Sequence, residues 1–140
     1  MSFRQRTIDP LAQLELFAGC TPSEILRARQ LLTMITVEPG TVLMEEGHYG
    51  MEFLIIAAGE AAVSIGGHEV ATLGRGDFVG EMSLIERGRR SATVTAVTPL
   101  TCYVANAAEF TALLEAAPSV GERILRTADA RRDANRQLAA

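Results

Sequence analysis

Residues 78–94 combine the side-chain types that bind a small phosphate. Gly80 allows the backbone to approach an anion closely. A helix that starts at Glu81 would present free N–H groups and the positive end of its dipole to that anion. Arg90, on the chain returning from the loop, can clamp the same anion through its planar set of donors. The stretch therefore predicts a phosphate-binding site.

Glu81 must have a different partner, because a carboxylate and a phosphate repel each other. It needs a donor, and a sugar hydroxyl is the obvious one. Each residue alone has an ordinary structural explanation: Glu81 could stabilise a helix dipole, and Arg90 could be a surface arginine paired with Glu86. Together, around one glycine, they favour a ligand that carries both a phosphate and a sugar.

Short strands separated by glycine fill the middle of the chain and must position this stretch. Gly66-Gly67 is typical of a tight hairpin, because both central positions of a type I′ turn need positive φ. Many short strands at this spacing indicate a sandwich or a barrel. The predicted strands cover 34–37, 41–44, 52–57, 61–65, 69–73, 92–97 and 101–104.

Helical patterns flank the strands on both sides. The first pair is predicted over 10–16 and 22–32, with Thr21 as a cap and Pro22 at the first helical position. The second pair is predicted over 107–116 and 119–138, with Pro118 between them and Ser119 as a cap. Helices around seven or more strands make an α+β domain.

Residues 78–94 resemble the phosphate-binding cassette of cyclic nucleotide-binding domains. Arg89 departs from the family pattern, because the kinase version often has proline there. The order of elements resembles the family as well, which implies an eight-stranded β jelly roll (double-stranded β-helix) flanked by N-terminal helices and two C-terminal helices, with the cassette helix inserted between later strands. The residues that match the pattern are Gly80, Glu81, Met82, Ser83 and Leu84, then Arg90, Ser91, Ala92, Thr93 and Val94.

The resemblance implies a role for each residue of the cassette. Glu81 takes the ribose 2′-hydroxyl, and Arg90 takes the exocyclic phosphate. Serine at position 91 favours cAMP, because threonine there accompanies cGMP preference in the family; cGMP is the alternative. Asn135 falls near the position where activator-type members contact adenine. The phosphate cradle is completed around Gly80, Met82, Ser83, Ser91 and Ala92.

Length and composition predict one domain, residues 1–140, with helices over 1–32, the jelly roll over 33–105 and C-terminal helices over 107–138. The chain has 140 residues, a net charge of −4 and 48% hydrophobic residues, so a second, catalytic domain does not fit and a nucleic-acid-binding surface is disfavoured. No long apolar run follows the N-terminal arginines, which predicts a cytoplasmic protein that does not insert into a membrane.

Isolated histidines and cysteines argue against metal chemistry. His48 and His68 stand twenty residues apart, without the paired spacing of a metal site. Cys20 and Cys102 are expected to be reduced thiols. We therefore predict no catalytic residue, no metal and no cofactor.

The sequence thus predicts a stand-alone cAMP sensor whose last helix moves over the bound base. No helix-turn-helix follows that helix, so the chain would be either a complete small protein that signals to an unknown protein effector or a regulatory module of a longer protein. A stripe along 119–138 could form a homodimer seam, although a solvated helix is an equal alternative. The rival function is a domain of the same fold that has lost its ligand and acts as a scaffold. The stripe consists of Val120, Ile124, Thr127, Arg131, Ala134 and Leu138.

Overall fold

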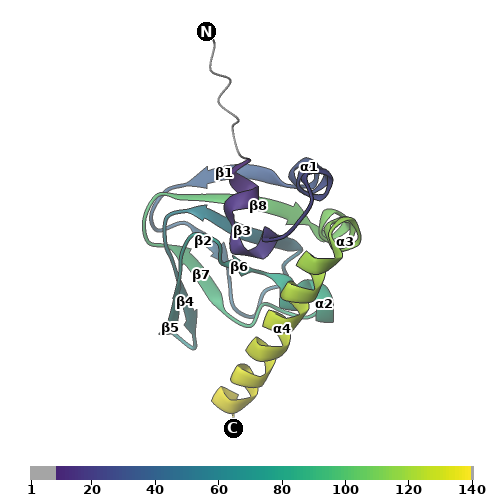
Figure 1. Cartoon of the computed structure of the whole chain (residues 1–140). Helices are drawn as coiled ribbons and strands as arrows, with labels where there is room; N and C mark the ends of the chain where they lie inside the picture. Colours follow the sequence, from purple (N-terminus) through teal and green to yellow (C-terminus); the bar gives the residue numbers. More distant parts are fainter. Residues whose placement is uncertain (1–8, 140) are drawn as a thin grey trace.

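In the computed structural model, which describes residues 9–139, two β-sheets face each other and helices cover one side of them (Figure 1). The strands in this range are antiparallel and form the sheets β1-β8-β3-β6 and β2-β7-β4-β5. This is the predicted jelly roll. Its strands are β1 (Thr33–Val37), β2 (Val42–Met44), β3 (Glu52–Ala58), β4 (Ala61–Ile65), β5 (His68–Leu73), β6 (Phe78–Val79), β7 (Thr93–Ala96) and β8 (Leu100–Asn106).

The β4–β5 hairpin forms as the glycine pair predicts. Gly66 and Gly67 have φ values of 59° and 82°, so both central positions lie in the left-handed region. The register pairs Ile65 with His68 across the turn. The hairpin turn is thus determined by two residues that carry no side chain.

The N-terminal helix predicted over 10–16 is wrong. This segment forms two 3₁₀ turns, η1 (Pro10–Gln13) and η2 (Glu15–Phe17), separated by Leu14 in an extended conformation. A continuous α-helix would turn Leu16 away from Leu11, because successive residues rotate by about 100°. The break at Leu14 lets Leu11, Leu16 and Phe17 all lie buried in the core.

The helices α1 (Pro22–Leu31), α2 (Glu81–Glu86), α3 (Ala107–Ala116) and α4 (Pro118–Ala139) complete the chain. The predicted Thr21 cap is confirmed: its hydroxyl accepts from the N–H of Glu24 at 3.1 Å. The predicted Ser119 cap is wrong. Helix α4 starts at Pro118, which suits a first position because it has no N–H to satisfy, and the Ser119 hydroxyl lies 3.7 Å from the sulfur of Cys20.

Strand β3 is buried on both faces and divides the core in two. Phe53 and Ile55 face the helices, where Phe53 meets the ring of Phe110 with centroids 4.9 Å apart. Leu54 and Ile56 point into the space between the sheets. Because neighbouring strand residues point to opposite faces, this strand is hydrophobic at every central position rather than at alternate ones.

Cys102 is fully buried in the core between the sheets, and Cys20 is partly buried. Both thiols are free. Burial raises the pKa of the Cys102 thiol to about 11. This thiol is therefore protonated at neutral pH and unreactive. The expectation of reduced cysteines agrees with the structure.

Helix α4 determines what covers the cassette. It runs from the end of α3 past α2, and its C-terminal half extends beyond the sheets (Figure 1). Val120, Ile124 and Ala128 are buried and attach its first half to the core. The second half lies beside α2, at the place where the predicted binding residues gather.

Candidate functional site

Strand β6 delivers the chain to the site through Gly80. This residue has φ 96°, and a Cβ atom there would come within 2.4 Å of the carbonyl oxygen of Glu52. Glycine is therefore required both by the backbone conformation and by the close approach to β3. Helix α2 begins at the next residue, Glu81, as the sequence predicts.

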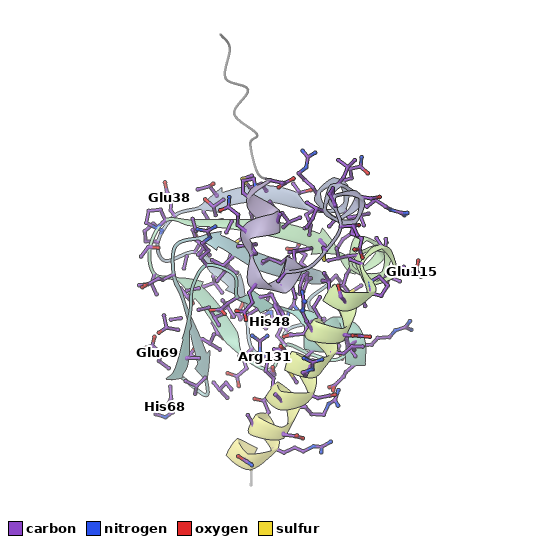
Figure 2. The ribbon with its side chains drawn as sticks, in the orientation of Figure 1. Glu38, His48, His68, Glu69, Glu115 and Arg131 are labelled. Carbon is purple, nitrogen blue, oxygen red and sulfur yellow. The ribbon has the colours of Figure 1, made fainter. Side chains whose placement is uncertain are left out.

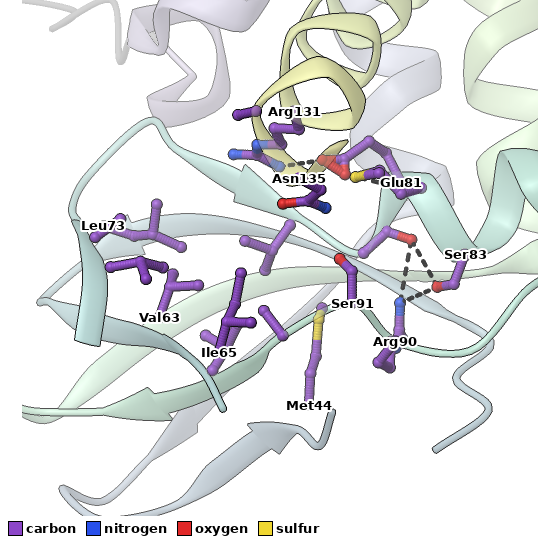
Figure 3. Close-up of a pocket in the computed structure, with 18 residues that line it drawn as sticks. Met44, Val63, Ile65, Leu73, Glu81, Ser83, Arg90, Ser91, Arg131 and Asn135 are labelled. Atoms are coloured by element: carbon purple, nitrogen blue, oxygen red, sulfur yellow. Dashed lines mark hydrogen bonds and ion pairs between the residues drawn. The ribbon is translucent and has the colours of Figure 1, made fainter. Parts of the chain in front are cut away.

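Arg90 returns from the loop into the body of the domain and is only 8% exposed. Its Nη1 donates to the carbonyl of Gly80 at 3.1 Å and to the hydroxyl of Ser83 at 2.5 Å (Figure 3). Its Nη2 donates to the carbonyl of Glu52 at 2.7 Å. Main-chain carbonyls from two separate segments thus fix the guanidinium, which limits its freedom before any ligand arrives.

No carboxylate of residues 9–139 lies within ion-pair distance of Arg90. Burial lowers the pKa of its guanidinium, and the more distant charges of Glu52 and Glu81 act in the opposite direction. Arginine stays protonated at neutral pH nonetheless. The result is a positioned, largely buried cation whose hydrogen-bond acceptors are neutral groups.

Gly50 lies against this guanidinium and was missed in the sequence. A Cβ atom there would sit 1.9 Å from Nε of Arg90. The backbone beside it is tied to the same residue, because the N–H of Arg90 donates to the carbonyl of His48 at 2.8 Å and the N–H of Gly47 donates to the carbonyl of Arg90 at 2.9 Å. The segment 47–50 therefore holds Arg90 in place from a part of the chain forty residues earlier.

Glu81 is even more deeply buried, at 1% exposure. Its Oε2 accepts from the N–H of Met82 at 3.1 Å, and its Oε1 accepts from Nη1 of Arg131 in α4. The Arg131 guanidinium also lies over the ring of Phe78, 5.2 Å from its centroid. The donor that Glu81 requires is thus supplied by the protein, which the sequence did not predict.

A second ion pair joins the same two helices. Arg132 pairs with Glu86 at the end of α2 and with Asp129 at 3.0 Å. The alternative pairing of Glu86 with Arg90 is therefore not found. Arg131 and Arg132 together attach the second half of α4 to α2.

Glu81, Arg90 and Arg131 line a cavity of about 300 Å³, a volume at the small end of the range for ligand sites. One end is polar and holds Arg90 and Glu81. The other end is an aliphatic wall from β2, β4, β5 and β7, and α4 closes the side with Arg131, Ala134 and Asn135 (Figure 3). The eight residues that the sequence predicted to bind ligand all line this cavity: Gly80, Glu81, Met82, Ser83, Arg90, Ser91, Ala92 and Asn135.

The stripe predicted as a dimer seam faces the domain itself. Val120 and Ile124 are completely buried, Arg131 pairs with Glu81, and Ala134 lines the cavity. The side chain of Leu138 lies outside the described residues. The helix uses this face to attach to its own core and to close the cavity.

The histidines do not form a metal site. His68 sits at the tip of the β4–β5 hairpin, well apart from His48 (Figure 2), and His48 lies 3.7 Å from Glu45 at the surface. Among residues 9–139, no three His, Cys, Asp or Glu side chains gather as metal ligands would. Within the same range, none of the helices has the length and apolar character needed to cross a bilayer.

Solved structures share this architecture. The chain superimposes on the catabolite activator protein of Thermus thermophilus with a TM-score of 0.73 and 29% identity, over 94% of this chain and 61% of that one. It superimposes on the CBD2 domain of PKAR with bound Sp-2Cl-cAMPS with a TM-score of 0.83, over 94% of this chain and 88% of that one. The second match, at 22% identity, shows the fold alone.

Sequence comparison gives the same answer. A cyclic nucleotide-gated potassium channel of Rhizobium etli is 33% identical over 122 residues, which cover 87% of this chain and 34% of the channel. The chain spans about a third of the length of such relatives. The family model of the cyclic nucleotide-binding domain matches residues 34–117. The fold, the cassette geometry and these matches agree, and the chain belongs to the family of cyclic nucleotide-binding domains.

Proposed function

We propose that the cavity binds cAMP and that the domain acts as its sensor. In this assignment Arg90 binds the exocyclic phosphate and Glu81 binds the ribose 2′-hydroxyl. Asn135 contacts the adenine, which lies along the aliphatic wall. The backbone and side chains that complete the phosphate cradle are those of Gly80, Met82, Ser83, Ser91 and Ala92.

The observation that carries this proposal is the state of Arg90. A buried cation without a carboxylate partner is unfavourable, and a bound phosphate would relieve that cost with charge-assisted hydrogen bonds. The cavity combines this cation with a carboxylate and an aliphatic wall. These three features match the phosphate, the sugar and the base of a cyclic nucleotide. Serine at position 91 supports the choice of adenine.

Signal transmission would pass through α4. A ligand shifts a conformational equilibrium only as far as it binds one state better than the other. Arg131, Ala134 and Asn135 place α4 against the cavity, so a bound ligand would contact the helix in this arrangement. We infer that binding changes the position or the order of α4, without any catalytic step in this domain.

The output of the sensor stays a prediction. We place the effector and any homodimer contact on the outer face of α4, where Leu125 is 46% exposed, because the inner face is occupied. A cytoplasmic location is likewise proposed. Light scattering of the chain with and without cAMP, compared with Leu125→Asp, tests the homodimer: the variant should be monomeric wherever the parent chain dimerises.

A thermal-shift series tests the ligand itself. The purified protein would be heated with cAMP, cGMP, AMP or a cyclic dinucleotide. A ligand present at one hundred times its dissociation constant adds about 2.7 kcal/mol to the free energy of unfolding. We expect cAMP to give the largest shift. Absence of a shift with every compound would refute the sensor and favour the ligand-free scaffold.

A further inference from the structure

The tip of the β4–β5 hairpin, residues 65–68, extends beyond the strand that supports it. Strand β4 pairs with β7 only as far as Ser64, which lies opposite Thr93. Strand β5 is the edge strand of its sheet, so no strand supports the tip from that side (Figure 1). Two strands paired only with each other are marginally stable in water. The tip therefore needs another contact to hold one position.

This hairpin forms a large part of the aliphatic wall. The register of β4 with β5 shifts after the pair Val63–Ala71, and Val70 is left without a partner across the hairpin. Such a β-bulge bends its strand and re-aims side chains. Val70 and Ala71 both line the cavity, although neighbouring residues of a regular strand point to opposite faces. Ile65, at the tip, lines it as well (Figure 3). The shape of the wall thus depends on where the tip is held.

Glu46 supplies the contact that holds the tip. Its Oε1 accepts a hydrogen bond from the N–H of Gly66 at 2.9 Å. Among residues 9–139, no other hydrogen bond or ion pair joins residues 65–68 to a residue outside the hairpin. Glu46 does not itself line the cavity. Any effect of this carboxylate on a ligand must therefore pass through the hairpin.

The backbone of Glu46 is attached to the chain that carries Arg90. The N–H of Glu46 donates to the hydroxyl of Thr93 at 3.0 Å, and the N–H of Gly47 donates to the carbonyl of Arg90 at 2.9 Å. Both donors belong to the backbone, so they persist when the side chain at position 46 is replaced. The carboxylate alone extends from this anchored position to the hairpin. It thereby fixes the aliphatic wall relative to the phosphate end.

We propose that Glu46 is a positioning residue for the base: it holds the hairpin tip and so determines how closely the aliphatic wall approaches the ligand. This inference rests on the proposed function, since it places the adenine along that wall. Loss of the carboxylate should weaken the contacts to the base. The contacts to the phosphate and the sugar should not change, because Arg90 and Glu81 make no hydrogen bond to the hairpin.

The first test compares cAMP with a methyl riboside 3′,5′-cyclic phosphate, which keeps the phosphate and the sugar but has no base. Calorimetric titration gives the dissociation constant of cAMP, and displacement of cAMP gives that of the weaker ligand. In Glu46→Ala the constant for cAMP should rise about three- to tenfold, the effect of losing one hydrogen bond. The constant for the ligand without a base should stay the same.

Two further variants show whether the hydrogen bond is responsible. Glu46→Gln keeps an oxygen acceptor at the same place and should restore most of the cAMP affinity. Glu45→Ala removes the neighbouring exposed glutamate, which lies 3.7 Å from His48. This matched control should bind both ligands as the parent chain does.

Hydrogen exchange measures the position of the hairpin without any ligand. Exchange of an amide reports the local opening that exposes it. In Glu46→Ala the amides of residues 64–69 should exchange about threefold faster or more than in the parent chain. Those of β8, in the core, should exchange at the parent rate. Glu46→Gln should again lie close to the parent chain.

The outcomes separate this inference from the function on which it rests. It is overturned if Glu46→Ala weakens both ligands equally, if it weakens neither, or if the hairpin amides exchange at the parent rate. In each of these cases, cAMP binding by the parent chain leaves the sensor intact. If the parent chain binds neither ligand, the proposed function falls and this inference falls with it.

Discussion

The phosphate end and the sugar end of the cavity are built from different parts of the molecule. At the phosphate end, Arg90 is held by carbonyls of β3 and of the β6–α2 connection, and Gly50 packs against it. At the sugar end, Glu81 meets Arg131, a residue of α4. The first end is complete without α4, whereas the second changes whenever α4 moves. Affinity can therefore come mainly from one end and the signal from the other.

The largest effect should follow from removing Arg90. Arg90→Ala should weaken cAMP binding about 30-fold or more, corresponding to a charge-assisted interaction of about 2 kcal/mol or more. Titration calorimetry measures it directly. Arg27→Ala, which removes an exposed arginine of α1, is the matched control and should bind as the parent chain does. Equal affinity in Arg90→Ala would mean that the phosphate lies elsewhere.

A second test perturbs the phosphate end without replacing a charged residue. Gly50→Ala places a methyl group where the Arg90 guanidinium lies and should displace it, so cAMP affinity should fall about tenfold, the effect of weakening one charge-assisted hydrogen bond. Gly74→Ala is the control, because a Cβ atom there meets nothing within 4 Å. Normal binding by Gly50→Ala would show that the phosphate end tolerates displacement and is not preformed.

The smallest effect is expected at the helix side of the cavity. Asn135→Ala removes one neutral hydrogen bond to the base, about 0.5–1.5 kcal/mol, so cAMP affinity should fall about two- to tenfold. Gln137→Ala, exposed on the same helix, should have no effect. Parallel titrations with cGMP would show whether Asn135 distinguishes the bases. A loss as large as that of Arg90→Ala would contradict the division of the cavity into a strong end and a signalling end.

Sequence reasoning succeeded where the signal lies within a few residues. The glycine pair at the hairpin, the Thr21 cap and the Gly80-Glu81 step each depend on local backbone geometry. The prediction that the cassette residues share one site also succeeded, because it came from the family resemblance, which includes their long-range arrangement. No feature of composition or periodicity alone would have brought Asn135 to the same place.

The failures all depend on tertiary packing. Strand β6 has two residues, too few for a periodic pattern, and forms because β3 offers it partners. The segment 10–16 breaks at Leu14 so that its apolar residues reach the core. Arg131 meets Glu81 across fifty residues of chain. A buried carboxylate needs a hydrogen-bond donor, so Glu81 indicated that a partner exists. The sequence did not identify Arg131 as that partner.

Arg90 also connects the lifetime of the protein to the concentration of its proposed ligand. Burial of the Arg90 guanidinium without a carboxylate at ion-pair distance costs folding free energy, and a bound phosphate would offset part of that cost. Ligand at a hundred times its dissociation constant would reduce the unfolded population about a hundredfold. Proteases degrade the unfolded chain, so cells with abundant nucleotide would accumulate the protein and cells without it would clear it. The same buried guanidinium would then influence the abundance of the protein as well as its occupancy by ligand.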